Sequence, residues 1–134
     1  MTRFEFQKWP VYETALGVVA QAYQVCNQLP RLTAPGLRDQ LKRASQSIPL
    51  NIAEGSSRYT SRDKAQFFRI ARGSVFECVA ILDLIPRLGF KTENLTPLYN
   101  DLETIGRMLS GLTNYVESES YKMKRKGFKS AERI

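Results

Sequence analysis

The 134-residue sequence contains no histidine and only two cysteines. Without histidine the chain lacks the commonest general base near neutral pH, and it cannot supply the Glu-x-x-His ligands of a di-iron helical bundle. Cys26 and Cys78 lie far apart inside apolar helical patterns, so we interpret them as small buried thiols rather than as a metal site or a disulfide. A Gly-rich phosphate loop is also missing. We therefore expect no enzymatic activity, no cofactor and no bound metal.

Long apolar runs are absent as well. No stretch approaches the ~20 consecutive apolar residues of a membrane span. Residues 1–10 (MTRFEFQKWP) lack the apolar core of a signal peptide. The length suits one domain. We expect a soluble, cytoplasmic protein with no membrane partner.

What the sequence does contain is helical periodicity. Apolar residues recur every three or four positions in four segments, at about residues 10–29, 34–55, 61–88 and 96–119. Short turns join these segments, and no strand-like alternation competes with them. The pattern predicts an all-α protein whose residues 1–121 form an antiparallel up-down-up-down four-helix bundle. Residues 122–134 lose the apolar period, and we expect them to form a basic, flexible tail.

Two of the expected helices carry more apolar surface than one small bundle needs. The first and third helices each show two adjacent apolar seams instead of one. Such wide faces favour burial against several helices or against another subunit.

The ends of the expected helices have recognisable signals. Gly55 is expected to end the second helix as a left-handed cap, and Thr60 or Ser61 to cap the start of the third. Pro49 lies inside the second helical pattern and should bend that helix. Asn51 is well placed to support the irregular turn around this proline.

Pairing the second and third helices as a hairpin brings polar residues to matching heights. Arg43 then faces Ser74 and Glu77, and Glu54 either caps the hairpin or pairs with Lys64. We interpret the set as an interhelical network that fixes helix register, in preference to a ligand site. Its members are Gln40, Arg43, Asn51, Glu54, Ser74 and Glu77.

Positive charge is concentrated in two parts of the chain, whose net charge is +7. Residues 31–72 hold nine basic against three acidic side chains, and residues 122–134 hold six against one. Residues 73–121 reverse this balance, with seven acidic against three basic side chains. The asymmetry fits a surface that faces a polyanion, although such a charge could also serve only to keep a small protein soluble.

Seven basic residues are candidate contacts to nucleic acid. Two lie one helical turn apart in the second helix, three surround the expected turn after it, and two continue along the third helix. They are Arg38, Lys42, Arg58, Arg62, Lys64, Arg69 and Arg72. Because no base-reading motif is present, we expect contacts to the phosphate backbone with weak sequence selectivity. Tyr59 could stack on an exposed base, but a lone tyrosine in a turn is more often a packing residue.

Two motifs carry a resemblance to a known family. The segments GLRDQLKRASQSIPLNIAEGSSR (Gly36–Arg58) and FFRIARGSVFE (Phe67–Glu77) resemble those of the 23S rRNA intervening-sequence proteins. These proteins are similar in turn to the accessory variability proteins of diversity-generating retroelements. The resemblance implies a four-helix bundle that assembles into a homopentamer with a central pore. For the retroelement branch it also implies a basic nucleic-acid-binding surface and a reverse transcriptase partner.

Three classes of function follow from these observations. The first is a non-enzymatic, oligomeric nucleic-acid-binding protein. The alternative is an oligomeric scaffold or accessory protein for a protein partner such as a reverse transcriptase, with the acidic fourth helix as docking face. An enzyme is the third and least supported class.

Overall fold

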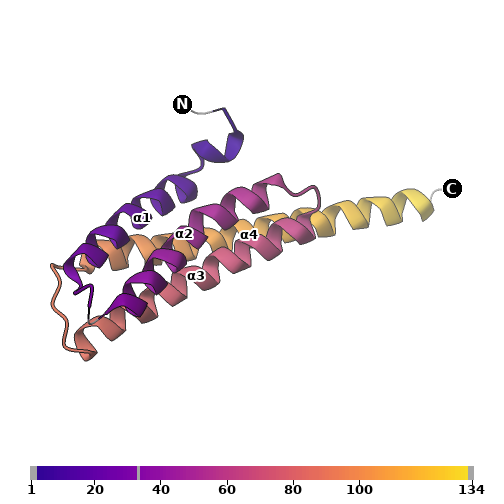
Figure 1. Cartoon of the computed structure of the whole chain (residues 1–134). Coiled ribbons are helices and arrows are strands. Elements are labelled where there is room, and N and C mark those ends of the chain that lie inside the picture. Colours follow the sequence, from indigo (N-terminus) through magenta and orange to yellow (C-terminus); the bar gives the residue numbers. More distant parts are fainter. Residues whose placement is uncertain (1–2, 33, 133–134) are drawn as a thin grey trace.

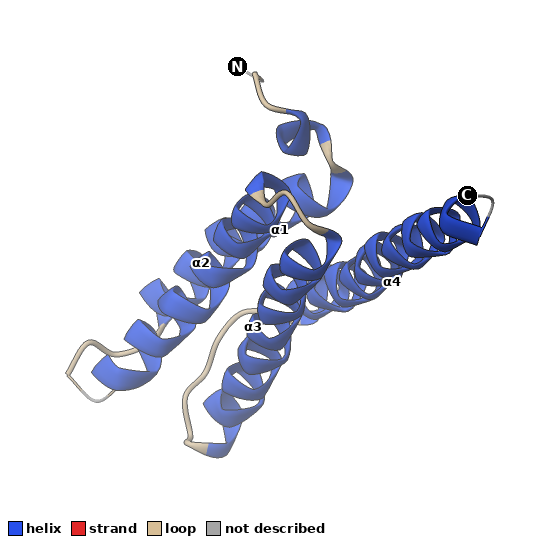
Figure 2. Cartoon of the chain, turned by 90° about the vertical axis from the view of Figure 1, so that its right-hand side faces the viewer, coloured by secondary structure: helices blue, strands red, loops and turns tan. Residues whose placement is uncertain are grey.

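The computed structural model describes residues 3–32 and 34–132, with side chains through Gly127. The elements are a 3-10 helix η1 (Glu5–Lys8) and the α-helices α1 (Pro10–Gln28), α2 (Pro35–Ser57), α3 (Ser61–Arg87) and α4 (Thr96–Glu132). Figure 2 shows helices and loops and no strand within these described ranges. The prediction of an all-α protein with four main helices is therefore confirmed.

Each α-helix packs against two others: α1 lies against α2 and α4, and α3 also lies against α2 and α4. The directions of α3 and α4 are opposed. Tyr99 near the start of α4 donates to Asp83 late in α3, at 2.7 Å, whereas Glu117 further along α4 pairs with Arg69 early in α3. Figure 1 shows the α1–α2 and α3–α4 connections at one end of the molecule and the α2–α3 turn at the other.

Local sequence signals explain most helix ends. Proline occupies the first position of both α1 and α2, where its missing N–H removes no helical hydrogen bond. Thr60 caps α3, because its hydroxyl accepts a hydrogen bond from the backbone N–H of Asp63 at 3.1 Å. Gly89 follows α3 with a φ of +86°, a conformation that other residues rarely adopt. The predicted cap at Thr60 is confirmed.

The core is a continuous apolar cluster between the four helices. Its largest fully buried members are Phe68, Leu41, Ile48, Ile52, Ile81, Leu82, Ile85, Leu102, Ile105 and Leu109. Val116 is the last buried apolar residue along α4 among the described side chains. Beyond it, α4 continues past the α2–α3 turn (Figure 1).

Gly55 does not end α2. The helix continues to Ser57, and Gly89 is the residue with positive φ in the described chain. Gly55 is instead buried against α3, where a Cβ would lie 2.6 Å from Cε1 of Phe68. The glycine therefore allows α2 to pack closely against α3. The sequence did not predict this role, because a glycine near a helix end is typical of a cap.

The fourth helix is longer than expected, so its predicted end near residue 119 is wrong. It runs to Glu132, while Arg133 and Ile134 of the expected tail lie outside the described residues. The apolar period indeed stops near Val116, but a helix does not need a buried face to continue. Residues 117–126 contain no glycine or proline and several strong helix formers, including glutamate, lysine, methionine and arginine.

Among the described helices, none is both long and apolar enough to span a bilayer.

Candidate nucleic-acid interface

Asn51 and Ser74, two members of the expected polar network, meet through a residue that the sequence analysis missed. Ser74 Oγ donates to Ser47 Oγ at 2.7 Å, and Asn51 Nδ2 donates to the same hydroxyl at 2.9 Å. Asn51 also donates to the backbone carbonyl of Ser47 at 2.8 Å, two residues before Pro49. These bonds tie α2 to α3 beside the proline, which is consistent with a role in helix register.

Arg43 and Glu77 do not form the expected ion pair in the described structure. Both side chains are exposed and lie with Gln40 around a polar pocket of about 570 Å³. An ion pair in water stabilises a protein by only ~0.2–1 kcal/mol, so little holds these two long side chains together.

Glu54 pairs with Arg58, the residue that follows its own helix, instead of across the hairpin. Its carboxylate accepts from the Arg58 guanidinium at 2.8 Å, because Arg58 lies one helical turn further along the same face. Lys64 does reach across from α3, but its Nζ donates to the backbone carbonyl of Ser56 at 3.0 Å. The expected pairing of Glu54 with Lys64 is therefore wrong, although Lys64 does close the hairpin.

Arg38 and Lys42 are engaged with α1. Arg38 is half-buried and donates from Nη1 to the carbonyl of Leu29 at 2.8 Å, so it satisfies a backbone acceptor just beyond the end of α1. The Lys42 ammonium lies 5.1 Å from the ring centre of Tyr23. Both residues help to hold α1 against α2, and neither is a free cation.

Three more of the seven candidates stack or pair within the protein. The guanidinium of Arg58 lies 4.6 Å from the ring centre of Phe67, and that of Arg72 lies 4.6 Å from the ring centre of Phe76. Arg69 forms an ion pair with Glu117 of α4. Among the seven, Arg62 is the one without a partner in the described structure, and its side chain is exposed.

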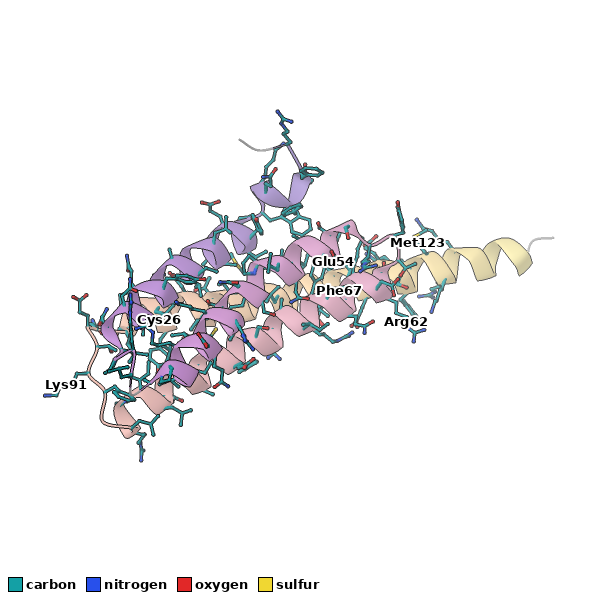
Figure 3. The ribbon with its side chains drawn as sticks, in the orientation of Figure 1. Cys26, Glu54, Arg62, Phe67, Lys91 and Met123 are labelled. Carbon is teal, nitrogen blue, oxygen red and sulfur yellow. The ribbon has the colours of Figure 1, made fainter. Side chains whose placement is uncertain are left out.

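The extension of α4 brings further positive charge to the end of the molecule at which Arg62 lies. The pair between Arg69 and Glu117 fixes the relative height of α3 and α4. Arg62 lies seven residues before Arg69 on α3, and Lys124 lies seven residues after Glu117 on α4. Because the two helices run in opposite directions, both steps lead toward the same end of the molecule and bring Arg62 to the height of Lys124. Figure 3 places the labelled Arg62 and Met123 at the same end of the molecule, with Lys91 at the opposite end.

We call this region the basic end and define it by Arg58, Arg62, Lys64, Lys124, Arg125 and Lys126. The last three are exposed side chains without a partner among the described residues. Two nearby carboxylates are paired, Glu54 with Arg58 and Glu119 with Lys122 at 3.4 Å, whereas the exposed carboxylate of Asp63 has no partner among the described residues. This joint surface was not predicted, because residues 122–134 were expected to form a flexible tail. Their helix-forming composition was the available signal.

The acidic side chains of α4 are also occupied. Asp101 accepts from Gln21 at 2.8 Å, and Glu103 pairs with Arg107 at 3.2 Å. Glu117 and Glu119 pair with basic residues as described above. Three of the four described carboxylates of α4 therefore have a basic partner, whereas Asp101 keeps its negative charge because Gln21 is a neutral amide.

Three apolar grooves lie between neighbouring helices of the described chain. One, of about 340 Å³, lies between the start of α1 and α4 and is lined by Trp9, Pro10, Val11, Met108 and Leu112. The α3–α4 groove has a volume of about 490 Å³ and is lined by apolar atoms of Val75, Phe76, Val79 and Leu102, among others. The α1–α2 groove has a volume of about 350 Å³ and is lined by Leu16, Val19, Ala20, Gln46, Pro49 and Leu50. Leu50 and Phe76 are 65% and 55% exposed, so each of these two grooves has a large apolar side chain open to solvent.

Both cysteines are free, buried thiols, as predicted. Burial raises the pKa of the Cys78 thiol to about 12, and the nearby Glu77 charge adds to this effect. Burial also raises the pKa of Cys26. Both thiols are therefore protonated and unreactive near neutral pH. No cluster of three or more metal-binding side chains occurs within the described residues.

The fold and the site together define an all-α protein of four packed helices with exposed apolar grooves and a basic end. The model of the family described as 23S rRNA-intervening sequence protein matches residues 7–111. The chain belongs to this family, and the resemblance seen in Gly36–Arg58 and Phe67–Glu77 is confirmed. The matched region ends before the extension of α4. A comparison with curated proteins found no match to this chain.

Proposed function

We propose that this protein is a non-enzymatic, oligomeric, cytoplasmic protein that binds the phosphate backbone of nucleic acid through its basic end. The proposal is supported by helix register, which brings Lys124 to the height of Arg62, and by the exposure of Arg62, Lys124, Arg125 and Lys126 at one end of the molecule. These four exposed side chains have no partner among the described residues, so an anion does not have to displace an existing ion pair. Each phosphate contact releases condensed counterions, which makes binding favourable and dependent on salt.

The proposed assembly is a homopentameric ring of antiparallel up-down-up-down bundles. Exposed apolar grooves on two sides of each subunit support it, because a closed ring needs one interface on either side of every subunit. A ring would repeat the basic end in each copy. Weak attraction of one subunit to phosphate would then become strong binding through multivalency.

The proposed function is tested by reversing charge at the basic end. In the triple variant Lys124→Glu, Arg125→Glu and Lys126→Glu, we expect nucleic-acid affinity to fall steeply. The slope of log K against log salt should become shallower by roughly 2 to 3, since each lost contact contributes ~0.7–0.9. The measurement is fluorescence anisotropy with labelled RNA and DNA at several salt concentrations.

A matched control reverses three basic residues at the opposite end. Arg31, Arg87 and Lys91 are likewise exposed, and Figure 3 shows Lys91 far from Arg62. Their reversal to glutamate changes the net charge equally, so it separates local contacts from overall charge. Equal losses of affinity in the two triple variants would contradict a localised interface, and salt-independent binding would contradict the phosphate mechanism.

The alternative function, an oligomeric scaffold or accessory protein for a protein partner such as a reverse transcriptase, assigns the α3–α4 groove to that partner instead of to a neighbouring subunit. The α3–α4 groove is open and apolar, with Arg72 and the Glu103–Arg107 pair at its rim. Such a groove suits an apolar protein segment better than it suits phosphate. Under this alternative, Phe76→Glu abolishes capture of the purified partner, whereas the triple reversal at the basic end leaves capture unchanged.

A further inference from the structure

Tyr59 lies in the short turn between α2 and α3 and packs against nothing in the described structure. Its side chain is 102% exposed, which is the exposure of a residue in an extended peptide. It makes no hydrogen bond, ring contact or ion pair with the described residues. The expectation that it is a packing residue is therefore wrong.

The two residues that flank Tyr59 are held in place, although the ring of Tyr59 itself makes no contact within the described structure. On one side, Arg58 is held by Glu54 and by the face of Phe67. On the other, Thr60 is held as the cap of α3 through its bond from Asp63. The backbone on either side is thus anchored to α2 and α3, and the tyrosine is presented to solvent from a fixed turn.

The surroundings of the ring are mostly cationic, with the exposed carboxylate of Asp63 as an exception. Arg62 follows in the first turn of α3, and the exposed lysines and arginine of α4 complete the basic end. Tyr121, on the part of α4 at this end, is also 66% exposed. Exposed aromatic rings among cations are the features with which proteins bind single-stranded nucleic acid, because bases stack on the rings while phosphates meet the charges.

We infer that Tyr59 stacks on an unpaired nucleobase, so that the basic end prefers single-stranded over double-stranded nucleic acid. This inference rests on the proposed function and specifies its ligand class. In a duplex the base faces are already stacked on one another and are closed to the ring. Stacking tolerates any base, so the preference concerns strandedness rather than sequence.

The test compares Tyr59→Ala and Tyr59→Phe with the wild-type full chain. The probes are a labelled single-stranded RNA of mixed sequence and the blunt duplex of that sequence. We expect Tyr59→Ala to weaken single-strand binding roughly 5- to 100-fold and to leave duplex binding unchanged. Tyr59→Phe keeps the ring and should bind both probes like the wild type. Because the side chain is fully exposed, both variants should melt at the wild-type temperature.

Arg62→Gln provides the contrast, because loss of a phosphate contact should weaken binding to both probes. If Tyr59→Ala binds the single strand as well as the wild type does, or loses both probes equally, the inference is overturned while the proposed function stands. Loss of single-strand binding in Tyr59→Phe would also overturn it, since the hydroxyl and not the ring would then be responsible. If the wild type binds neither probe, the proposed function fails and the inference fails with it.

Discussion

At Gly55 the backbone of α2 comes too close to α3 for a side chain to fit without movement. A Cβ there would lie 2.6 and 2.9 Å from two ring carbons of Phe68 and 3.1 Å from Cβ of Phe67. The Phe68 ring is 1% exposed and cannot swing into solvent. We expect Gly55→Ala to destabilise the protein by on the order of 1–2 kcal/mol, since overpacking a core costs ~1–3 kcal/mol. The free energy of unfolding from chemical denaturation measures this.

Gly73 is the matched control because it also lies inside a helix, in α3, but has no atom within 4 Å of its ideal Cβ. Gly73→Ala should stabilise the protein by ~0.5–1 kcal/mol, the usual gain from replacing glycine inside a helix. The two substitutions are chemically identical, so opposite signs isolate the contact with Phe68. A stabilising effect of Gly55→Ala would show that α2 and α3 are less tightly packed than described.

At the scale of whole elements, the helices were predictable because their signals are local and repeated. An apolar period, prolines at two starts and a threonine cap each act within a few residues of the helix that they define. The end of α4 was not predictable in this way, because that helix outlasts its buried face. The roles of Gly55 and of Ser47 also escaped the sequence, since both depend on which residue of a second helix lies opposite.

The same limit applies to the candidate site. Basic residues could be counted from the sequence, but the sequence does not show which of them already have a partner within the protein. Arg69 is paired, Arg38 serves a backbone carbonyl, and Arg58 lies on an aromatic ring. Each of these contacts joins residues from different parts of the chain or depends on the exact helix face. Charge alone therefore overestimates the number of free cations at a surface.

The extension of α4 should be separable from the folded core. Every buried apolar residue of the described chain precedes residue 117, so removing residues 122–134 leaves the core intact. We expect the truncated protein to melt close to the temperature of the full chain. It should nevertheless bind nucleic acid more weakly and with a shallower salt slope, because six basic side chains and one acidic side chain are lost.

Calorimetry and salt-titrated anisotropy on the truncated protein check these two expectations separately. A large fall in melting temperature would show that the extension contributes to folding. Unchanged affinity would place the nucleic-acid contacts elsewhere on the molecule.

For the whole molecule, two of the grooves suggest how copies would meet. The helices contact one another in the cyclic order α1, α2, α3, α4, so the α1–α2 groove and the α3–α4 groove lie on opposite sides of the bundle. The grooves also differ in shape and lining. An interface between unlike faces is heterologous, and such interfaces close into rings when the rotation between neighbours permits.

This head-to-tail arrangement predicts an unusual result for two single variants. Leu50→Glu blocks the α1–α2 groove and Phe76→Glu blocks the α3–α4 groove, so each variant alone should be monomeric. Each still keeps one intact face, and the intact faces are complementary. An equimolar mixture should therefore form a dimer that grows no further, as measured by light scattering after size-exclusion chromatography. If one variant alone remained dimeric, its intact groove would pair with the same groove of a second copy across a two-fold axis, which would contradict the head-to-tail ring.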